Sequence, residues 1–172
     1  MSADDAPAAH AVVSRRPWVI GISGASGTPY AAAVLRGLLG AGEAVDLVVS
    51  RAARLTLLDE TGIAWHADLE SLLAWLNAPL DSADAAVGLP TPVHEADADV
   101  RFWSAGDLAA APSSGSYRTR GMIVVPASTA AVAGIALGLS KDLLQRAADV
   151  TLKERRPLVV VPREAPLTRI TL

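Results

Sequence analysis

The chain has 172 residues, 51% of them hydrophobic and 19% charged, which indicates one globular domain with its own core and excludes a disordered chain. The formal net charge of −3 argues against a basic protein that binds nucleic acid or an anionic membrane. No apolar run is long enough to span a bilayer. Because the sequence contains no cysteine, disulfides, thiolate zinc sites and cysteine nucleophiles are excluded. We expect a cytoplasmic protein.

Residues 1–16 are predicted to form a disordered tail. Their acidic residues come first and their arginines follow a short apolar patch, which is the reverse of the order in a secretory signal. Residues 17–172 are predicted to form a single domain.

Within that domain, short apolar runs alternate with Ala- and Leu-rich stretches that end at glycine or proline. Strand, helix and strand at this spacing predict βαβ units, and therefore a Rossmann-like, doubly wound parallel sheet of the α/β class. Strands are expected at 17–22, 44–49, 100–103, 122–125 and 158–161, and helices at 28–39, 51–60, 69–76, after 129 and at 141–155.

The turn after the first predicted strand consists of small residues, G-I-S-G-A-S-G at 21–27. Glycines allow a ligand to approach the backbone, and the start of the following helix offers N–H groups to an anion. The spacing is not that of the dinucleotide motif, and Ser50 stands where an acidic residue would hold a ribose. The turn therefore favours a mononucleotide over NAD, with a simple tight turn as the alternative.

Hydroxyl residues follow two further strands, Ser50 after the second and Ser128 in P-A-S-T-A-A at 126–131. Strand ends of a parallel sheet meet at one edge, so these residues could converge on one phosphate. For Ser128, capping of the next helix explains the residue equally well.

Cations gather near the C-terminal end of the sequence. Arg146 and Lys153 are seven residues apart on a predicted helix and share a face, and Arg163 and Glu164 follow the last predicted strand. Such cations can hold a phosphate, and a carboxylate among them can move a proton. A solvated basic helix end, favoured by the helix dipole, is an equal alternative.

Taken together, the motifs closely resemble those of the flavin prenyltransferase (UbiX-like) family. The similarity begins near residue 17 and is weak over 63–102. It rests on G-I-S-G-A-S-G-T-P-Y (21–30), V-V-S-R-A-A (48–53), S-S-G-S-Y-R-T (113–119), P-A-S-T (126–129), L-x-R-A-A-D-V-x-L-K-E-R-R-P-L-V (144–159) and V-P-R-E-A-P-L (161–167).

The resemblance implies an enzyme that joins a dimethylallyl group from dimethylallyl phosphate to N5 and C6 of reduced FMN. The product, prenylated FMN, would serve UbiD-type decarboxylases. The resemblance also implies independence of metal, a homododecamer and a site between subunits. It makes residues 17–172 an FMN-binding domain that stops before the family's last strand and helix, which carry a Tyr and a basic residue toward the phosphate.

Position by position, the resemblance also implies roles for individual residues. FMN would contact Gly24, Ala25, Ser26, Ser50, Ser128, Thr129, Ala130, Ala131 and Arg163. The prenyl phosphate would contact Ser114, Arg146, Lys153 and Arg163. Catalysis would depend on Ser26, Arg146, Lys153 and Glu164, with Ser26 near N5 and Glu164 moving a proton to the leaving phosphate.

Two alternatives remain open. One is an FMN-binding protein without catalysis. The other is a related flavin-dependent cysteine decarboxylase, although the turn at 126–131 lacks the Asn typical of that class and no histidine falls between Val100 and Leu172. An NAD enzyme of the short-chain type is disfavoured because the sequence has no Tyr-x-x-x-Lys pair.

Overall fold

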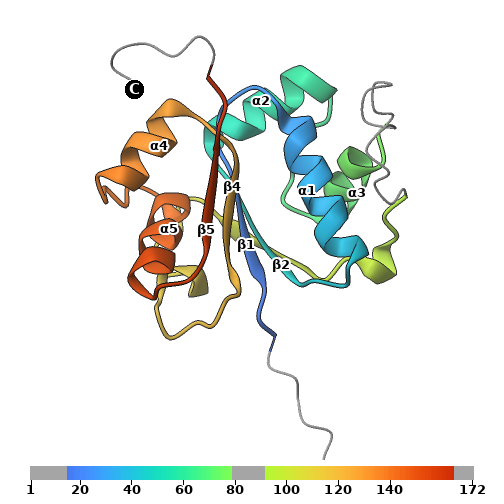
Figure 1. The fold of residues 1–172 in the computed structure, drawn as a ribbon. Helices are drawn as coiled ribbons and strands as arrows, with labels where there is room; N and C mark the ends of the chain where they lie inside the picture. Colours follow the sequence, from blue (N-terminus) through green and yellow to red (C-terminus); the bar gives the residue numbers. More distant parts are fainter. Residues whose placement is uncertain (1–14, 79–91, 165–172) are drawn as a thin grey trace, which may run out of the picture.

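The computed structural model describes residues 15–78 and 92–164. Its sheet has five parallel strands in the order β3-β2-β1-β4-β5, as the α/β class predicts (Figure 1). The strands are β1 (Trp18–Ile22), β2 (Val45–Val49), β3 (Val100–Ser104), β4 (Gly121–Ala127) and β5 (Leu158–Pro162).

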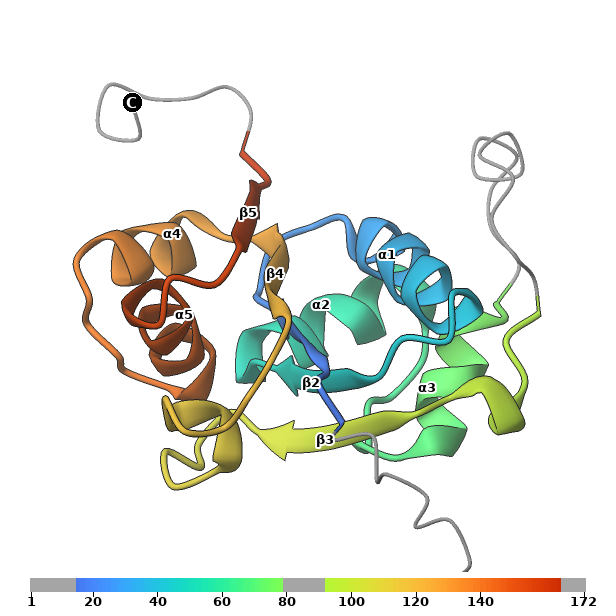
Figure 2. The same ribbon diagram turned by 60° about the horizontal axis from the view of Figure 1, so that its bottom comes forward.

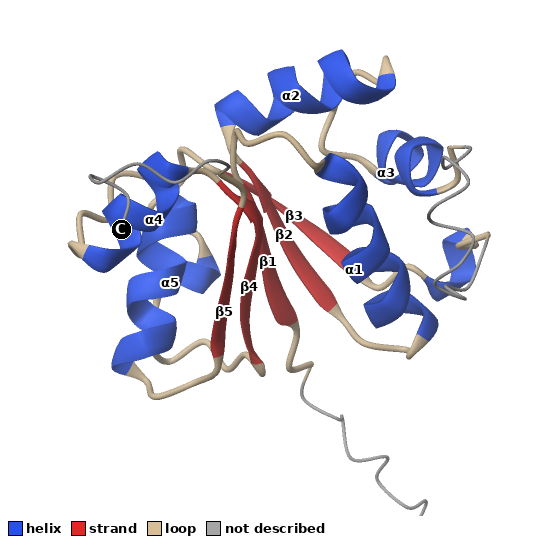
Figure 3. Cartoon of the chain, turned by 45° about the horizontal axis from the view of Figure 1, so that its top comes forward, coloured by secondary structure: helices blue, strands red, loops and turns tan. Residues whose placement is uncertain are grey.

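Helices cover both faces of the sheet, which makes the fold doubly wound. Figure 3 shows α1, α2 and α3 on one side and α4 and α5 on the other. The helices are α1 (Thr28–Gly40), α2 (Arg51–Thr61), α3 (Leu69–Leu76), α4 (Thr129–Ala136) and α5 (Leu143–Lys153), with short 3-10 turns η2 (Glu95–Asp97) and η3 (Ala111–Ser113). No helix in the described ranges is long and apolar enough to cross a membrane.

Each layer of helices has its own apolar core against the sheet. On the α1 side, Ile20, Leu35 and Leu47 are fully or almost fully buried. On the α5 side, Met122 and Leu144 are buried in the same way. The central strands β1 and β4 read as nearly continuous apolar runs because both faces of the sheet are covered there.

The strand order places a switch point between β1 and β4. From β1 the chain winds to β2 and β3 in one direction, and β4 and β5 then add on the other side of β1. In open α/β sheets the ligand crevice lies at such a point, beyond the carboxyl ends of the strands. Figure 2 shows α4 and α5 on one side of β4 and α1 and α3 on the other.

The predicted elements are confirmed to within a few residues, with two differences. The last helix, predicted at 141–155, begins at Leu143 and is capped by Asp142, whose carboxylate accepts a hydrogen bond from the Gln145 N–H; the residue before the predicted range, Ser140, had been expected to cap it. The predicted tail lies mostly outside the described residues, but Arg15 is described and makes ion pairs with Asp46 and Asp99. Asp142 has the extended backbone of an N-cap and a negative charge at the positive end of the helix dipole, whereas Ser140 has a left-handed φ of 47°, which explains the first difference.

Candidate functional site

A cavity of about 240 Å³ lies at the switch point. Its walls come from the turns that follow β1, β2 and β4 and from the start of α5, so three separate strand ends build it. The lining residues are Ser23, Gly24, Ser50, Arg51, Ala52, Ser128, Ala130, Ala131, Asp142, Leu144 and Gln145. The turns predicted to converge on a phosphate therefore do surround one space.

Ser23 ties two of these turns together. Its buried hydroxyl donates to the carbonyl of Pro126 at 2.9 Å and accepts from the backbone N–H of Ser128 at 2.7 Å. These bonds fix the turn after β1 against the turn after β4. Ser23 belongs to the predicted turn of small residues, where its hydroxyl was expected to serve as a donor, but these bonds span more than 100 residues and have no local signal in the sequence.

Ser50 and Ser128 each begin a helix. The Ser50 hydroxyl accepts from the Ala53 N–H, and the Ser128 hydroxyl accepts from the Ala131 N–H. Capping is thus confirmed for Ser128, and ligand contact is not excluded by it, since each hydroxyl keeps a proton to donate. Two helix N-termini facing one cavity favour a bound anion.

Gly24 lies in close contact with the start of α2. A Cβ on Gly24 would lie 2.3 Å from the Cβ of Ala52, a distance that forces one backbone segment to move. Glycine is therefore required here by the close approach and not by a left-handed conformation.

Gly24→Ala is expected to lower the free energy of unfolding by about 1–3 kcal/mol, as overpacking does, and to weaken flavin binding. Chemical denaturation and a flavin titration would measure both. Gly37→Ala is the matched control, because a Cβ there meets no atom within 4 Å and alanine favours the helix by about 0.5–1 kcal/mol. Equal stabilities for the two variants would contradict the close-approach argument.

The start of α1 is already occupied by a side chain. Glu60 of α2 accepts four hydrogen bonds there, from the hydroxyls of Ser26 and Thr28 at 2.6 Å each and from the backbone N–H groups of Gly27 and Thr28 at 2.8 Å each. The prediction that this helix start offers free N–H groups to a ligand is therefore wrong, because a carboxylate takes them. Ser26 itself does not line the cavity, although its neighbour Gly24 does.

Sequence reasoning missed Glu60 because it lies more than 30 residues from its partners. Desolvation raises the pKa of Glu60, but the hydrogen bonds from Ser26, Thr28 and Gly27 outweigh it and hold that pKa below its ordinary value.

This lowered pKa predicts a pH dependence of stability. A carboxylate with a lowered folded pKa stabilises the fold above its unfolded pKa, and the stabilisation is lost as pH falls through the folded pKa. Wild-type protein should therefore exceed Glu60→Gln in unfolding free energy at about pH 6, with the gap closing toward about pH 3. Urea denaturation at both pH values measures the gap, and a constant gap would contradict the role of the charge.

The predicted phosphate ligands Ser114 and Lys153 lie at the other end of α5. Lys153 is the last residue of α5, while Gln145, eight residues earlier, lines the cavity. At 1.5 Å per residue this separates them by roughly 12 Å along the helix. Ser114 belongs to the loop beside that far end, since a Cβ on its neighbour Gly115 would lie 2.3 Å from the Glu154 carboxylate.

Arg146 occupies the outer face of α5 between these ends and pairs with Asp149 at 2.7 Å. Within one chain, the structure thus separates the predicted prenyl-phosphate ligands Ser114 and Lys153 from the predicted flavin ligands. The two groups of predicted ligands nevertheless lie at opposite ends of the same helix, α5.

Arg163 returns to the cavity's edge. Its backbone N–H donates to the carbonyl of Ala127 at 3.0 Å, and its side chain passes 3.9 Å from the position of a Cβ on Gly27. Glu164 follows it and is exposed. Residues 165–167, the end of the predicted V-P-R-E-A-P-L motif, lie outside the described residues.

The predicted flavin ligands fall into two groups. Gly24, Ser50, Ser128, Ala130 and Ala131 line the cavity. Ala25, Ser26, Thr129 and Arg163 are not part of that lining, although each is adjacent in sequence or contact to a turn that forms it. Arg51, Asp142 and Gln145 line the cavity without having been predicted.

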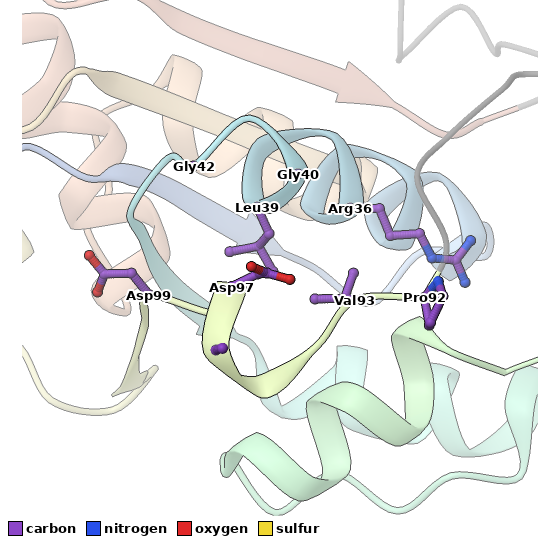
Figure 4. Close-up of a pocket in the computed structure, with 9 residues that line it drawn as sticks. Arg36, Leu39, Gly40, Gly42, Pro92, Val93, Asp97 and Asp99 are labelled. Atoms are coloured by element: carbon purple, nitrogen blue, oxygen red, sulfur yellow. The ribbon is translucent and has the colours of Figure 1, made fainter.

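A larger cavity, about 520 Å³, lies near the end of α1, away from the strand carboxyl ends (Figure 4). Two of its polar side chains are engaged elsewhere: Arg36 donates from Nε to the carbonyl of Leu76 at 2.6 Å, and Asp99 pairs with Arg15 at 3.0 Å. It shares no residue with the predicted site. In the described ranges, no cluster of three or more His, Asp or Glu side chains could hold a metal ion.

The Flavoprotein family model matches residues 8–169, and the chain therefore belongs to the flavoproteins. Within them it belongs to the UbiX flavin prenyltransferase family. It is 66% identical over 161 residues to the flavin prenyltransferase UbiX of Streptomyces coelicolor, covering 91% of this chain and 70% of that protein. With the UbiX of Pseudomonas aeruginosa the identity is 37%, covering 89% and 67%.

Solved structures agree with this assignment. AnUbiX (PadA1), crystallised with FMN and dimethylallyl pyrophosphate, has a TM-score of 0.71 at 36% identity, covering 91% of this chain and 69% of that one. A dodecameric FMN-dependent UbiX-like decarboxylase from Escherichia coli O157:H7 has a TM-score of 0.65 at 37% identity, covering 90% and 70%. The cypemycin decarboxylase CypD, at 15% identity and a TM-score of 0.57, shares the fold alone.

Proposed function

We propose that this protein transfers a dimethylallyl group from dimethylallyl phosphate to N5 and C6 of reduced FMN, which yields prenylated FMN and releases phosphate. The carrying observation is the convergence of Gly24, Ser50 and Ser128 on one cavity at the sheet's switch point, in a chain 66% identical to a flavin prenyltransferase. An FMN-dependent cysteine decarboxylase, TvaF, is only 12% identical to this chain.

The residues around the cavity fit the phosphate-bearing part of FMN. Small side chains at Gly24 and Ala130 leave room, and the hydroxyls of Ser50 and Ser128 stand at two helix starts. Ser50 and Ser128 would hold the phosphate, with Arg163 supplying a charge at the rim. When bound, reduced FMN would supply the nucleophilic N5 and C6 atoms.

Ser26 and Glu60 would transfer a proton beside the flavin. The Ser26 hydroxyl donates to Glu60 Oε1 at 2.6 Å, so a proton can pass between ligand, serine and carboxylate. Glu164 would deliver a proton to the departing phosphate, with the Arg163 guanidinium next to it in the chain.

Arg146, Lys153 and Ser114 would neutralise and hold the prenyl phosphate. Loss of an allylic phosphate is accelerated by preorganised positive charge at the leaving oxygens. Because Lys153 lies far along α5 from the cavity of its own chain, we place it at the flavin of a second copy. A homododecamer with the site between subunits accounts for this separation, and the dodecameric relative supports it.

The remaining parts of the proposal are supply of the product to a UbiD-type decarboxylase, a cytoplasmic location and independence of metal. The direct test of the reaction is release of inorganic phosphate under anaerobic conditions, with EDTA present. Release should require both reduced FMN and dimethylallyl phosphate. Flavin binding without any phosphate release would favour the non-catalytic alternative.

A further inference from the structure

The arginine that ends the K-E-R-R run, Arg156, reaches across to the loop of residues 113–119. Its guanidinium donates from Nη2 to the carbonyl of Gly115 at 2.8 Å, and from Nη1 to the carbonyl of Tyr117 at 2.8 Å and to the hydroxyl of Thr119 at 3.1 Å. The side chain is half-buried, so these bonds are partly shielded from water. One side chain thereby holds every second residue of the loop from 115 to 119.

The backbone conformation at the end of α5 directs the Arg156 side chain toward the loop. The N–H of Arg155 bonds to the carbonyl of Leu152, the N–H of Arg156 bonds to the carbonyl of Thr151, and Arg155 has a left-handed φ of 54°. This is the double-bonded helix ending that reverses the chain direction. After the reversal, Arg156 faces the loop and Arg155 faces solvent.

The loop held in this way carries Ser114. The Ser114 hydroxyl lies 2.9 Å from the Ser116 hydroxyl, and Gly115 between them packs against Glu154, which pairs with Lys153 at 3.5 Å. The position of Ser114 relative to Lys153 is therefore set by how the loop sits on the end of α5. Arg156 supplies the polar bonds that hold it there.

We propose that Arg156 is a positioning residue for the prenyl phosphate: it holds the loop 113–119 so that Ser114 meets the same phosphate as Lys153. This inference rests on the proposed function. The Nη1 and Nη2 atoms of a planar guanidinium are held apart in a fixed fork that reaches all three acceptors, whereas a lysine ammonium offers its donors from a single atom. Lysine at this position should keep the charge and lose the loop geometry.

The test combines backbone hydrogen exchange of the FMN-free protein with steady-state kinetics of Arg156→Lys and Arg156→Gln. Exchange in residues 113–119 should speed up by about tenfold or more. KM for dimethylallyl phosphate should rise by about tenfold with little change in the affinity for FMN, because Ser114 is assigned to the prenyl phosphate and not to the flavin. Guanidinium ion added to Arg156→Ala should restore part of the lost affinity, whereas equal sodium chloride should not.

Arg155→Gln is the matched control, since it removes a neighbouring arginine with the same charge and leaves the loop bonds in place. It should match wild type in both measurements. Unchanged loop exchange in Arg156→Lys and Arg156→Gln, or faster exchange with an unchanged KM, would overturn the inference. If wild-type protein shows no prenyl transfer, the proposed function fails. The exchange measurement still stands on its own in that case: faster exchange of the loop in the Arg156 variants shows that Arg156 orders the loop, and unchanged exchange shows that it does not.

Discussion

Lys153→Ala is expected to lower the rate of prenyl transfer by about 10²- to 10³-fold while leaving FMN affinity unchanged. The Lys153 side chain is 58% exposed, and the Nζ atom pairs with Glu154 at 3.5 Å. Its removal therefore costs little packing, and such an exposed pair contributes little to stability. What the variant loses is a positive charge at the departing phosphate, so the loss should fall on catalysis.

Lys141→Ala is the matched control, because Lys141 is exposed and precedes the same helix. It should retain wild-type turnover. Rates from single-turnover assays and FMN affinities from fluorescence titration would distinguish the two lysines. If Lys153→Ala turned over normally, Lys153 would be a solvated helix end and not a phosphate ligand.

The same variant tests where the second half of the site comes from. Lys153→Ala should be inactive alone, and so should a variant that spoils the flavin cavity, Ser50→Tyr. When the two are dissociated and reassembled together, some sites would combine an intact cavity with an intact Lys153 from another copy. Recovered activity in the mixture is the expected result, and none in verified mixed oligomers would place the whole site within one chain.

Arg15→Ala is expected to lower the free energy of unfolding by about 3–5 kcal/mol, as loss of one partner of a buried ion pair does. The Asp46 side chain is fully buried in β2, and its Oδ1 lies 2.5 Å from Arg15 Nη1. Arg15 also pairs with Asp99 at 3.0 Å and donates to the carbonyl of Val45 at 2.9 Å. Burial lowers the pKa of Arg15, but the bonds to Asp46 and Asp99 outweigh it and raise that pKa above its ordinary value.

Without Arg15, the buried Asp46 carboxylate would lose its ion-pair partner, and its Oδ2 already lacks a hydrogen-bond partner among the described residues. Denaturation by urea measures the loss. Arg16→Ala, which changes an exposed neighbour, should alter stability by less than about 0.5 kcal/mol. Arg15→Met combined with Asp46→Leu should recover most of the loss. A loss of under about 1 kcal/mol in Arg15→Ala would show that the pair is solvated.

The sequence predicted the parts of this molecule that depend on local pattern. Buried strands such as 122–125 are apolar runs between turns of Gly and Ser, so their positions follow from the local pattern. Because the ends of parallel strands meet at one edge of the sheet, the shared cavity at those ends follows as well. Ser50 and Ser128 were predicted for the same reason, since a hydroxyl residue between a strand and a helix has a defined place.

What the sequence did not reveal depends on distant contacts. Glu60 meets Ser26 across more than 30 residues, and Arg156 meets Gly115 across 41. No local pattern distinguishes these charges from ordinary solvated ones in an acidic helix end or a basic run. Nor did spacing alone reveal that Lys153 and the flavin cavity lie at opposite ends of one helix, although the resemblance implied a site between subunits.

The central claim, that this chain makes prenylated FMN, is tested most directly by the mass of the flavin it releases. The purified protein would be incubated with reduced FMN and dimethylallyl phosphate without oxygen, and the flavin extracted for mass spectrometry. We predict a flavin heavier than FMN by one prenyl unit, formed at wild-type rate and nearly absent with Lys153→Ala. Recovery of unmodified FMN alone, from protein that binds FMN and is correctly assembled, would contradict the claim.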